Sequence, residues 1–124
     1  MKKRSDGAEV LIKSVLKGIY NKKGQDILKI DLRKLENRIT DYFVICNGSS
    51  VTQVASICDS VEDTVRDKAG EKPIHIEGRN NCFWVLVDYG NVIVHIFLTE
   101  YRNFYSLESL WADASIEKME EKVK

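Results

Sequence analysis

The sequence has few of the residues that mark a specialised class of protein. Its 124 residues include one proline, two histidines and three cysteines, and 19 basic residues balance 19 acidic ones. A net charge of zero argues against broad electrostatic capture of nucleic acid, which depends on many Lys and Arg contacts to phosphates. No apolar run approaches the roughly 18 residues of a membrane-spanning helix, and no signal-peptide core follows the basic start. We therefore expect a cytoplasmic protein with no membrane partner.

The cysteines favour the same compartment. The chain has an odd number of cysteines, Cys46, Cys58 and Cys82, and no Cys-x-x-Cys pair. This pattern is typical of reduced thiols in a cytosolic protein. Cys46 and Cys58 lie within apolar patterns, where cysteine behaves as a small hydrophobic side chain. We expect both in the core of a single domain, because a chain of this length can bury a core without crosslinks.

The chain is organised around residues 83–98, in which two apolar runs flank the pair Gly90-Asn91. Both runs are rich in Val, Ile, Phe and Trp, which fit a pleated and buried surface. Gly-Asn between such runs predicts a two-residue hairpin with a type I′ turn, in which both central residues have positive φ. Strict alternation with polar residues is missing, so we expect helices or a partner to cover both faces of the hairpin.

Two helices precede the hairpin. Apolar residues at helical spacing predict the first over 8–20, with Gly24 as a left-handed cap. Ser50 and Gln53 form a capping box that opens the second helix, which ends at Gly70.

Apolar runs predict three more strands, at 26–32, 41–46 and 74–76. We expect the strand–helix–strand unit from 41 to 77 to be a right-handed crossover that joins parallel strands. With the two arms of the hairpin, these elements predict an α/β fold: a single domain with a mixed sheet of about five strands flanked by helices.

The C-terminal part of the chain is less apolar. Leu107, Leu110 and Trp111 predict a short helix within 106–111. Residues 115–124 are helix-prone but charged, which favours a frayed tail outside the core. We therefore predict a domain over residues 1–113 and a charged tail over 114–124.

The turn Gly48-Ser49-Ser50 follows a strand and opens a helix, which is where a phosphate can bind. A plain helix cap is the alternative, and a P-loop would need Lys-Ser or Lys-Thr after its last Gly. Nucleotidyltransferases share the Gly-Ser opening, but they also need a carboxylate pair on the next strand to hold metal ions. Here that strand offers His75 and Glu77, which are not such a pair.

The two histidines, His75 and His95, fall on predicted strands and could meet there. With Glu77 or Cys82 they could bind zinc, although the spacing lacks the short intervals of zinc sites. The alternative is that both histidines form hydrogen bonds within or beside the sheet. We predict no catalytic residue, metal site or cofactor.

Alternation along the first arm of the hairpin separates two sets of side chains. Trp84, Leu86 and Asp88 point to one side, and the residues between them point to the other. One side must face the helices, and the other then carries a Trp and an acid, with Tyr89 at the turn. Such aromatic anchors beside polar groups are typical of binding hot spots. A second helix over this side is an equal alternative.

Four motifs resemble one protein family. They lie at residues 40–50, 76–78, 84–97 and 107–111, and include Thr-Asp-Tyr-Phe, Glu-Gly, Asp-Tyr-Gly-Asn and Leu-Glu-x-Leu-Trp. In this order and spacing they resemble the ribosomal silencing factor family, also called the Iojap family. The resemblance covers about residues 8–112.

The resemblance implies a fold and a function. The family fold is a small α/β sandwich, like a nucleotidyltransferase core without its catalytic acids. Members bind protein fourteen of the large ribosomal subunit, block joining of the small subunit and damp translation when nutrients are scarce. A member would be no enzyme and would meet no nucleic acid beyond neighbouring ribosomal RNA. A homodimer is a candidate assembly.

Matching motif positions, with the hairpin side described above, predict a set of partner-binding residues. These are Asp41, Glu77, Trp84, Leu86, Asp88 and Tyr89. The chain departs from the family pattern at 79–82, at Leu98-Thr99 and at Ser109, which affects the rim of the predicted surface rather than its centre.

Overall fold

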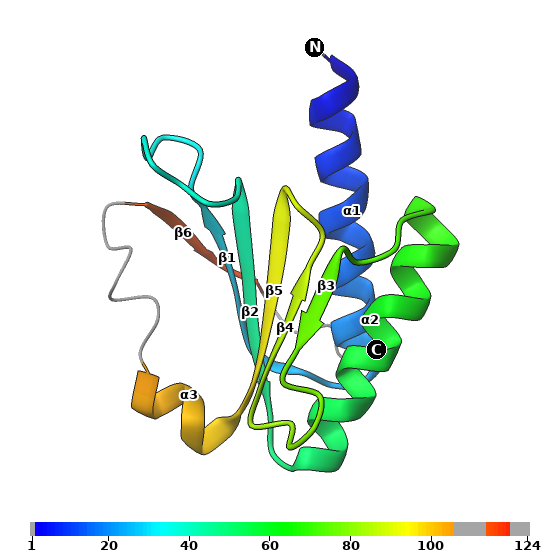
Figure 1. Cartoon of the computed structure of the whole chain (residues 1–124), viewed down its shortest axis with the longest axis vertical. Helices are drawn as coiled ribbons and strands as arrows, with labels where there is room; N and C mark the ends of the chain where they lie inside the picture. Colours follow the sequence, from blue (N-terminus) through cyan, green and yellow to red (C-terminus); the bar gives the residue numbers. More distant parts are fainter. Residues whose placement is uncertain (1, 106–113, 120–124) are drawn as a thin grey trace.

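The computed structural model describes residues 2–105 and 114–119, which form two layers (Figure 1). One layer is a six-stranded sheet, and helices α1 (Lys2–Asn21) and α2 (Val51–Ala69) pack against one of its faces. A short helix, α3 (Thr99–Tyr105), lies at the end of the sheet on the side away from α1 and α2. The predicted α/β domain is therefore confirmed, with six strands in place of about five. No helix of the described residues is both long and apolar enough to cross a membrane.

The sheet is mixed, with strand order β3-β4-β5-β2-β1-β6. Its strands are β1 (Gln25–Asp31), β2 (Tyr42–Gly48), β3 (His75–Glu77), β4 (Trp84–Asp88), β5 (Val92–Leu98) and β6 (Ser115–Lys118). β2 and β5 pair in parallel at the centre, and the other neighbours pair antiparallel. β3 therefore runs in the same direction as β2, as the crossover predicts. The two strands are not neighbours, however, because the hairpin β4–β5 lies between them.

The C-terminal strand β6 corrects a prediction. Residues 115–118 form an edge strand that pairs with β1 instead of forming a frayed helical tail, and Ile116 lies opposite Ile30. The amide of Met119 donates to the carbonyl of Ile27 at 2.8 Å, and Lys29 pairs with Glu117 at 3.6 Å. All four side chains of β6 are exposed, so apolar patterning gave no strand signal here. The helix predicted within 106–111 lies outside the described residues.

The hairpin forms as predicted, but its turn is of another type. Tyr89 donates its amide to the carbonyl of Val92 at 2.9 Å, which leaves Gly90 and Asn91 as the two central residues. Gly90 has a φ of 95° and Asn91 has no positive φ. This is the pattern of a type II′ turn, which needs positive φ only at its first central residue. Asn91 is also tied down, because its carbonyl accepts the Tyr42 amide at 3.1 Å.

The core between the sheet and the helices contains Cys46 and Cys58, as predicted. The two helices cross closely at Gly18, because a Cβ there would lie 2.8 Å from the Cα of Val61. The buried hydroxyl of Ser60 donates to the Gly18 carbonyl at 2.8 Å across this crossing. Burial raises the pKa of the Cys46 thiol to about 12 and that of Cys58 to about 11, so both are protonated and unreactive.

The end of α1 differs from the prediction in one residue. Lys23, with a φ of 60°, takes the left-handed conformation that we assigned to Gly24. Gly24 donates its amide to the carbonyl of Ile19 at 3.0 Å. A Cβ on Gly24 would lie 2.4 Å from the Ile19 side chain, so this glycine serves close packing.

Candidate partner-binding face

The sheet face away from α1 and α2 carries most of the predicted binding residues. Val85 and Val87 of β4 are buried beneath the helices, whereas Trp84, Leu86 and Asp88 alternate to the other side and are partly exposed. Strand pairing extends this side into a row, because Leu86 lies opposite both Glu77 of β3 and His95 of β5. We call this surface the Trp84 face and define it by Glu77, Trp84, Leu86 and Asp88, and His95 lies buried beneath it.

Trp84 is held at the sheet by a hydrogen bond and by ring stacking. Its indole Nε1 donates a hydrogen bond to Nδ1 of His95 at 3.1 Å. Its ring stacks on Phe97, with centroids 4.9 Å apart and an interplanar angle of 24°. Phe43 meets the His95 ring edge-on, at 4.6 Å between centroids. The Trp84 face is therefore built on an aromatic layer formed by β2, β4 and β5.

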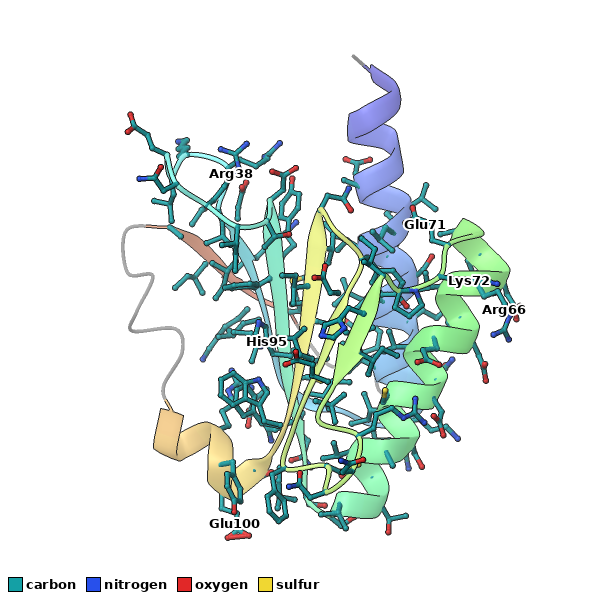
Figure 2. All side chains as sticks on the ribbon, in the orientation of Figure 1. Arg38, Arg66, Glu71, Lys72, His95 and Glu100 are labelled. Carbon is teal, nitrogen blue, oxygen red and sulfur yellow. The ribbon has the colours of Figure 1, made fainter. Side chains whose placement is uncertain are left out.

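His95 lies halfway along the sheet (Figure 2), and only 5% of its surface is exposed. Burial lowers the pKa of its imidazole to about 4, so the ring is neutral at pH 7. Because Nδ1 accepts the indole proton, the single imidazole proton is on Nε2. Nε2 is buried and has no hydrogen-bond partner in the described part of the chain.

The histidines do not form a metal site. His75 is exposed on the edge strand β3, and its Nε2 lies 2.7 Å from a carboxylate oxygen of Glu77. His95 is two strands away, and the residues that the structure describes contain no group of three or more potential ligands. The alternative of hydrogen-bonded histidines is confirmed, by the Glu77 contact for His75 and by the Trp84 contact for His95.

Asp88 has a structural role at the turn. Its Oδ1 atom accepts the amide of Gly90 at 2.7 Å, which holds the first central residue of the turn. Its side chain remains partly exposed beside His75, the residue opposite it on β3. The carboxylate can therefore cap the turn with one oxygen and face solvent with the rest of its surface.

Two predicted binding residues lie elsewhere. Tyr89 is 5% exposed and packs in the core beneath the helices. Its hydroxyl is buried without a partner among the described residues, and burial raises the pKa of the phenol. Asp41 lies on the loop before β2, where it accepts a hydrogen bond from Nε of Arg38 at 3.0 Å. The structure therefore brings together Glu77, Trp84, Leu86 and Asp88, but not Tyr89 or Asp41.

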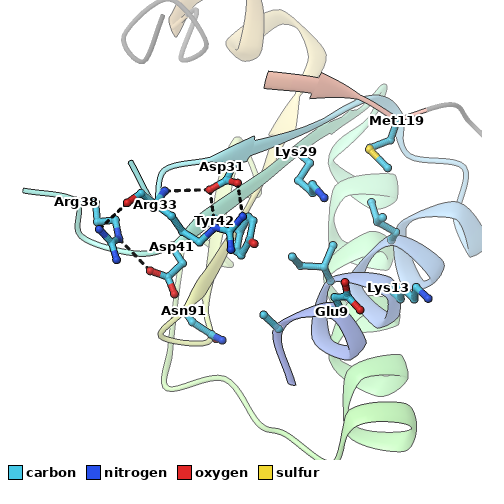
Figure 3. A pocket seen from close by; sticks show the side chains of 13 residues that line it. Glu9, Lys13, Lys29, Asp31, Arg33, Arg38, Asp41, Tyr42, Asn91 and Met119 are labelled. Carbon is cyan, nitrogen blue, oxygen red and sulfur yellow. Dashed lines mark hydrogen bonds and ion pairs between the residues drawn. The ribbon is translucent and has the colours of Figure 1, made fainter. Parts of the chain in front are cut away.

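Asp41 lines a groove of about 810 Å³ between α1 and the ends of β1 and β2 (Figure 3). Arg33 bonds both carboxylate oxygens of Asp31, at 2.9 and 2.8 Å, and lies over the Tyr42 ring at 5.1 Å. Hydrogen bonds from Arg33 hold the pKa of the Asp31 carboxyl below its usual range. Arg33 and Arg38 are thus each paired with an acid, and these pairs brace the loop between β1 and β2.

In the Gly48-Ser49-Ser50 turn, both serines form hydrogen bonds with Gln53 in the first turn of α2. Ser50 Oγ accepts the amide of Gln53 at 3.1 Å, which confirms the predicted cap. The Gln53 side chain reaches back to accept the Ser49 amide at 2.7 Å and donates to the carbonyls of Lys22 and Lys23. A phosphate at this turn would have to displace the Gln53 side chain.

A buried polar network at the end of β2 was missed by the sequence analysis. Arg102 of α3 is 8% exposed and donates to Oδ1 of Asn47 at 2.8 Å and to the carbonyl of Asp26 at 2.5 Å. Asn47 donates in turn to the hydroxyl of Thr99 at 3.0 Å. The network fixes α3 to the end of the sheet. The available signal was a polar Asn at the end of a fully buried strand.

A known protein family matches almost the whole chain. A family model described as "Ribosomal silencing factor during starvation" matches residues 5–124. The chain belongs to this family.

Individual relatives cover most of the chain. The ribosomal silencing factor of Bacillus subtilis is 39% identical over 108 residues, which are 84% of this chain and 90% of the relative. A mouse protein named "Mitochondrial assembly of ribosomal large subunit protein 1" is 32% identical over 107 residues, or 85% of this chain and 46% of the relative. A crystal structure of a Chromobacterium violaceum protein superposes with a TM-score of 0.74 at 29% identity, covering 97% of this chain and 92% of that one.

Proposed function

We propose that this protein is a non-enzymatic repressor of translation in the cytoplasm. It binds the large ribosomal subunit through ribosomal protein number fourteen and sterically blocks joining of the small subunit when nutrients are limiting. Its contact surface is the Trp84 face. The observation that carries the proposal is the partly exposed Trp84 and Leu86 on a rigid sheet, with the acids Glu77 and Asp88 on the same face.

The chemistry of this face fits a protein partner. A partly exposed Trp beside an aliphatic residue, with charged residues around them, is the composition of an interface hot spot. The two acids favour a partner with basic side chains at the rim. The names of the relatives support a ribosomal partner, since one is a silencing factor and the mouse protein is named for assembly of the large subunit.

The two other predicted residues take supporting roles in this proposal. Tyr89 anchors the hairpin from the core, and Asp41 holds the preceding loop through Arg38. The nearby hydroxyl of Thr40 donates to the carbonyl of Gly90 at 2.8 Å, which connects that loop to the hairpin turn. Both residues therefore act on the shape of the Trp84 face rather than on the partner directly.

Co-sedimentation with isolated large subunits tests the proposal. We expect wild-type protein to pellet with large subunits and Leu86→Glu to remain in the supernatant, because a charge would replace the apolar centre of the face. Lys68→Glu, at an exposed position of α2 on the opposite layer, is the matched control and should bind like wild type. Binding by Leu86→Glu at wild-type strength would refute this surface.

A subunit-joining assay tests the consequence of binding. Pre-bound wild-type protein should lower the yield of complete ribosomes from purified subunits, and Leu86→Glu should not.

The competing function is nucleotide binding or nucleotidyl transfer at the Gly48-Ser49-Ser50 turn. A titration with magnesium and nucleoside triphosphate tests it, and saturable binding lost in Ser49→Ala would favour it. Sedimentation of the free protein tests the candidate homodimer.

A further inference from the structure

We infer that His95 is the positioning residue of Trp84: its Nδ1 atom holds the indole N–H and so fixes the ring on the Trp84 face. His95 is 5% exposed, so it acts through Trp84 and does not touch a partner itself. The effect on ribosome binding rests on the proposed function. The hydrogen bond itself can be tested on the free protein.

The hairpin register brings the two residues together. Leu86 lies directly opposite His95, and Trp84 lies opposite Phe97, so Trp84 and His95 are diagonal neighbours on one face. Diagonal neighbours are within reach of each other when the side chains are aromatic. The stack on Phe97 at 4.9 Å sets the plane of the indole, and the bond from Nε1 to Nδ1 at 3.1 Å sets its rotation in that plane.

His95 lowers the stability of the folded state because it buries a hydrogen-bond donor that an apolar residue would not have. A neutral imidazole has one donor and one acceptor, and the indole N–H can only donate, so the acceptor is used and the Nε2 proton is left over. No partner for Nε2 exists among the described residues. An unsatisfied buried donor destabilises the folded state, whereas a Leu or Phe at position 95 would bring no such donor. The hydrogen bond from the Trp84 indole offsets part of this cost.

The first test observes the indole directly in free protein labelled with ¹⁵N-tryptophan. The Trp84 indole resonance is identified by its absence in Trp84→Phe, which separates it from that of Trp111. His95→Leu should move this resonance and speed its exchange with water, because the acceptor is gone. His95→Asn, which keeps an oxygen near the position of Nδ1, should preserve most of the protection. A Trp84 resonance that is unchanged in His95→Leu would overturn the inference.

The second test is a double-mutant cycle on binding to isolated large subunits. His95→Leu should weaken binding about fivefold, or about 1 kcal/mol, the scale of one neutral hydrogen bond. In a Trp84→Phe background the same change should have almost no effect, because there is no indole to position. Equal losses in both backgrounds would overturn the inference, since His95 would then act without Trp84.

The two tests fail in distinguishable ways. If wild-type protein does not bind large subunits, the proposed function fails while the indole resonance still decides the role of His95. Thermal unfolding of each variant is measured alongside. Should His95→Leu not fold, His95→Phe takes its place, because it also lacks an acceptor and fills the space of the imidazole.

Discussion

The carbonyl oxygen of Trp84 lies 2.1 Å from the position that a Cβ on Gly78 would occupy. Gly78 also has a φ of 88°, in the left-handed region that favours glycine. Its own carbonyl accepts the amide of Cys82 at 3.0 Å, which closes the loop between β3 and β4. Backbone packing therefore explains the glycine at this position, because Gly78 lets the chain pass directly against the first residue of β4.

Gly78→Ala should be much more destabilising than Gly70→Ala. Gly70, the cap of α2, has a φ of 68° but no atom within 4 Å of a Cβ, so it isolates the cost of the left-handed backbone. We expect that change to cost about 1 kcal/mol and Gly78→Ala at least twice as much. Urea unfolding of both variants measures the difference. Equal losses in the free energy of unfolding for the two variants would show that the backbone shifts to remove the contact with Trp84 at no cost in stability.

Trp84→Ala should weaken binding to isolated large subunits by about 2 kcal/mol or more, the scale of an interface hot spot. The side chain is partly exposed on the Trp84 face and is large enough to serve as its anchor. Lys68→Ala, on the opposite layer, is the control and should bind normally. Circular dichroism must show that the variant is folded, because the ring also packs on Phe97. Unchanged affinity in folded Trp84→Ala would remove Trp84 from the interface.

Asp88→Asn should separate the two roles of this carboxylate. Asn keeps an oxygen that can accept the Gly90 amide, so the thermal midpoint should stay close to that of wild type. Loss of the charge should weaken binding to a basic partner, and wild-type binding should weaken as salt rises. Asp88→Ala loses the cap as well and should cost about 1 kcal/mol of stability. If Asp88→Asn binds like wild type, the role of Asp88 is confined to the turn.

Stability should fall as the pH is lowered from about 6.5 towards 4 because of His95. The folded protein holds this imidazole neutral down to a pKa of about 4, below the ordinary 6.5, so the unfolded chain binds more protons in this window. The stabilisation is complete above pH 6.5 and is lost as pH falls, with a limit of about 3 kcal/mol. Urea unfolding across this range measures the slope.

Two variants identify the source of that slope. His95→Leu should flatten the dependence between pH 6.5 and 4, because the buried titrating group is removed. His75→Gln removes the exposed imidazole of β3 and should leave the dependence in place. A slope that persists in His95→Leu would assign it to other groups.

The Trp84 face was largely predictable because one turn determines its register. Once Gly90 and Asn91 are the central residues, Leu86 must lie opposite His95, and alternation separates Trp84 from Val85. The same alternation places Tyr89 on the side of Val85, beneath the helices. That signal was present in the sequence, but Tyr89 was predicted to be an exposed binding residue because it lies beside the turn.

Other features depend on tertiary contacts that no local pattern encodes. The strand β6 has no buried side chain, so its conformation comes from main-chain pairing with β1. The burial of Arg102 depends on Asn47, 55 positions away in the sequence. The type of turn at Gly90 depends on the Asp88 carboxylate and on Tyr42 of another strand.

The two edges of the sheet limit how this protein can meet others. β3 has three residues and follows Pro73, and β6 has four exposed residues that include Glu117 and Lys118. Short, charged or proline-flanked edge strands resist the addition of a strand from another chain, which is how many proteins avoid aggregation. Recognition by main-chain pairing is therefore disfavoured at both edges. Under the proposed function, selectivity comes from side chains on the sheet face, where a single substitution can abolish a contact without exposing the sheet to self-assembly.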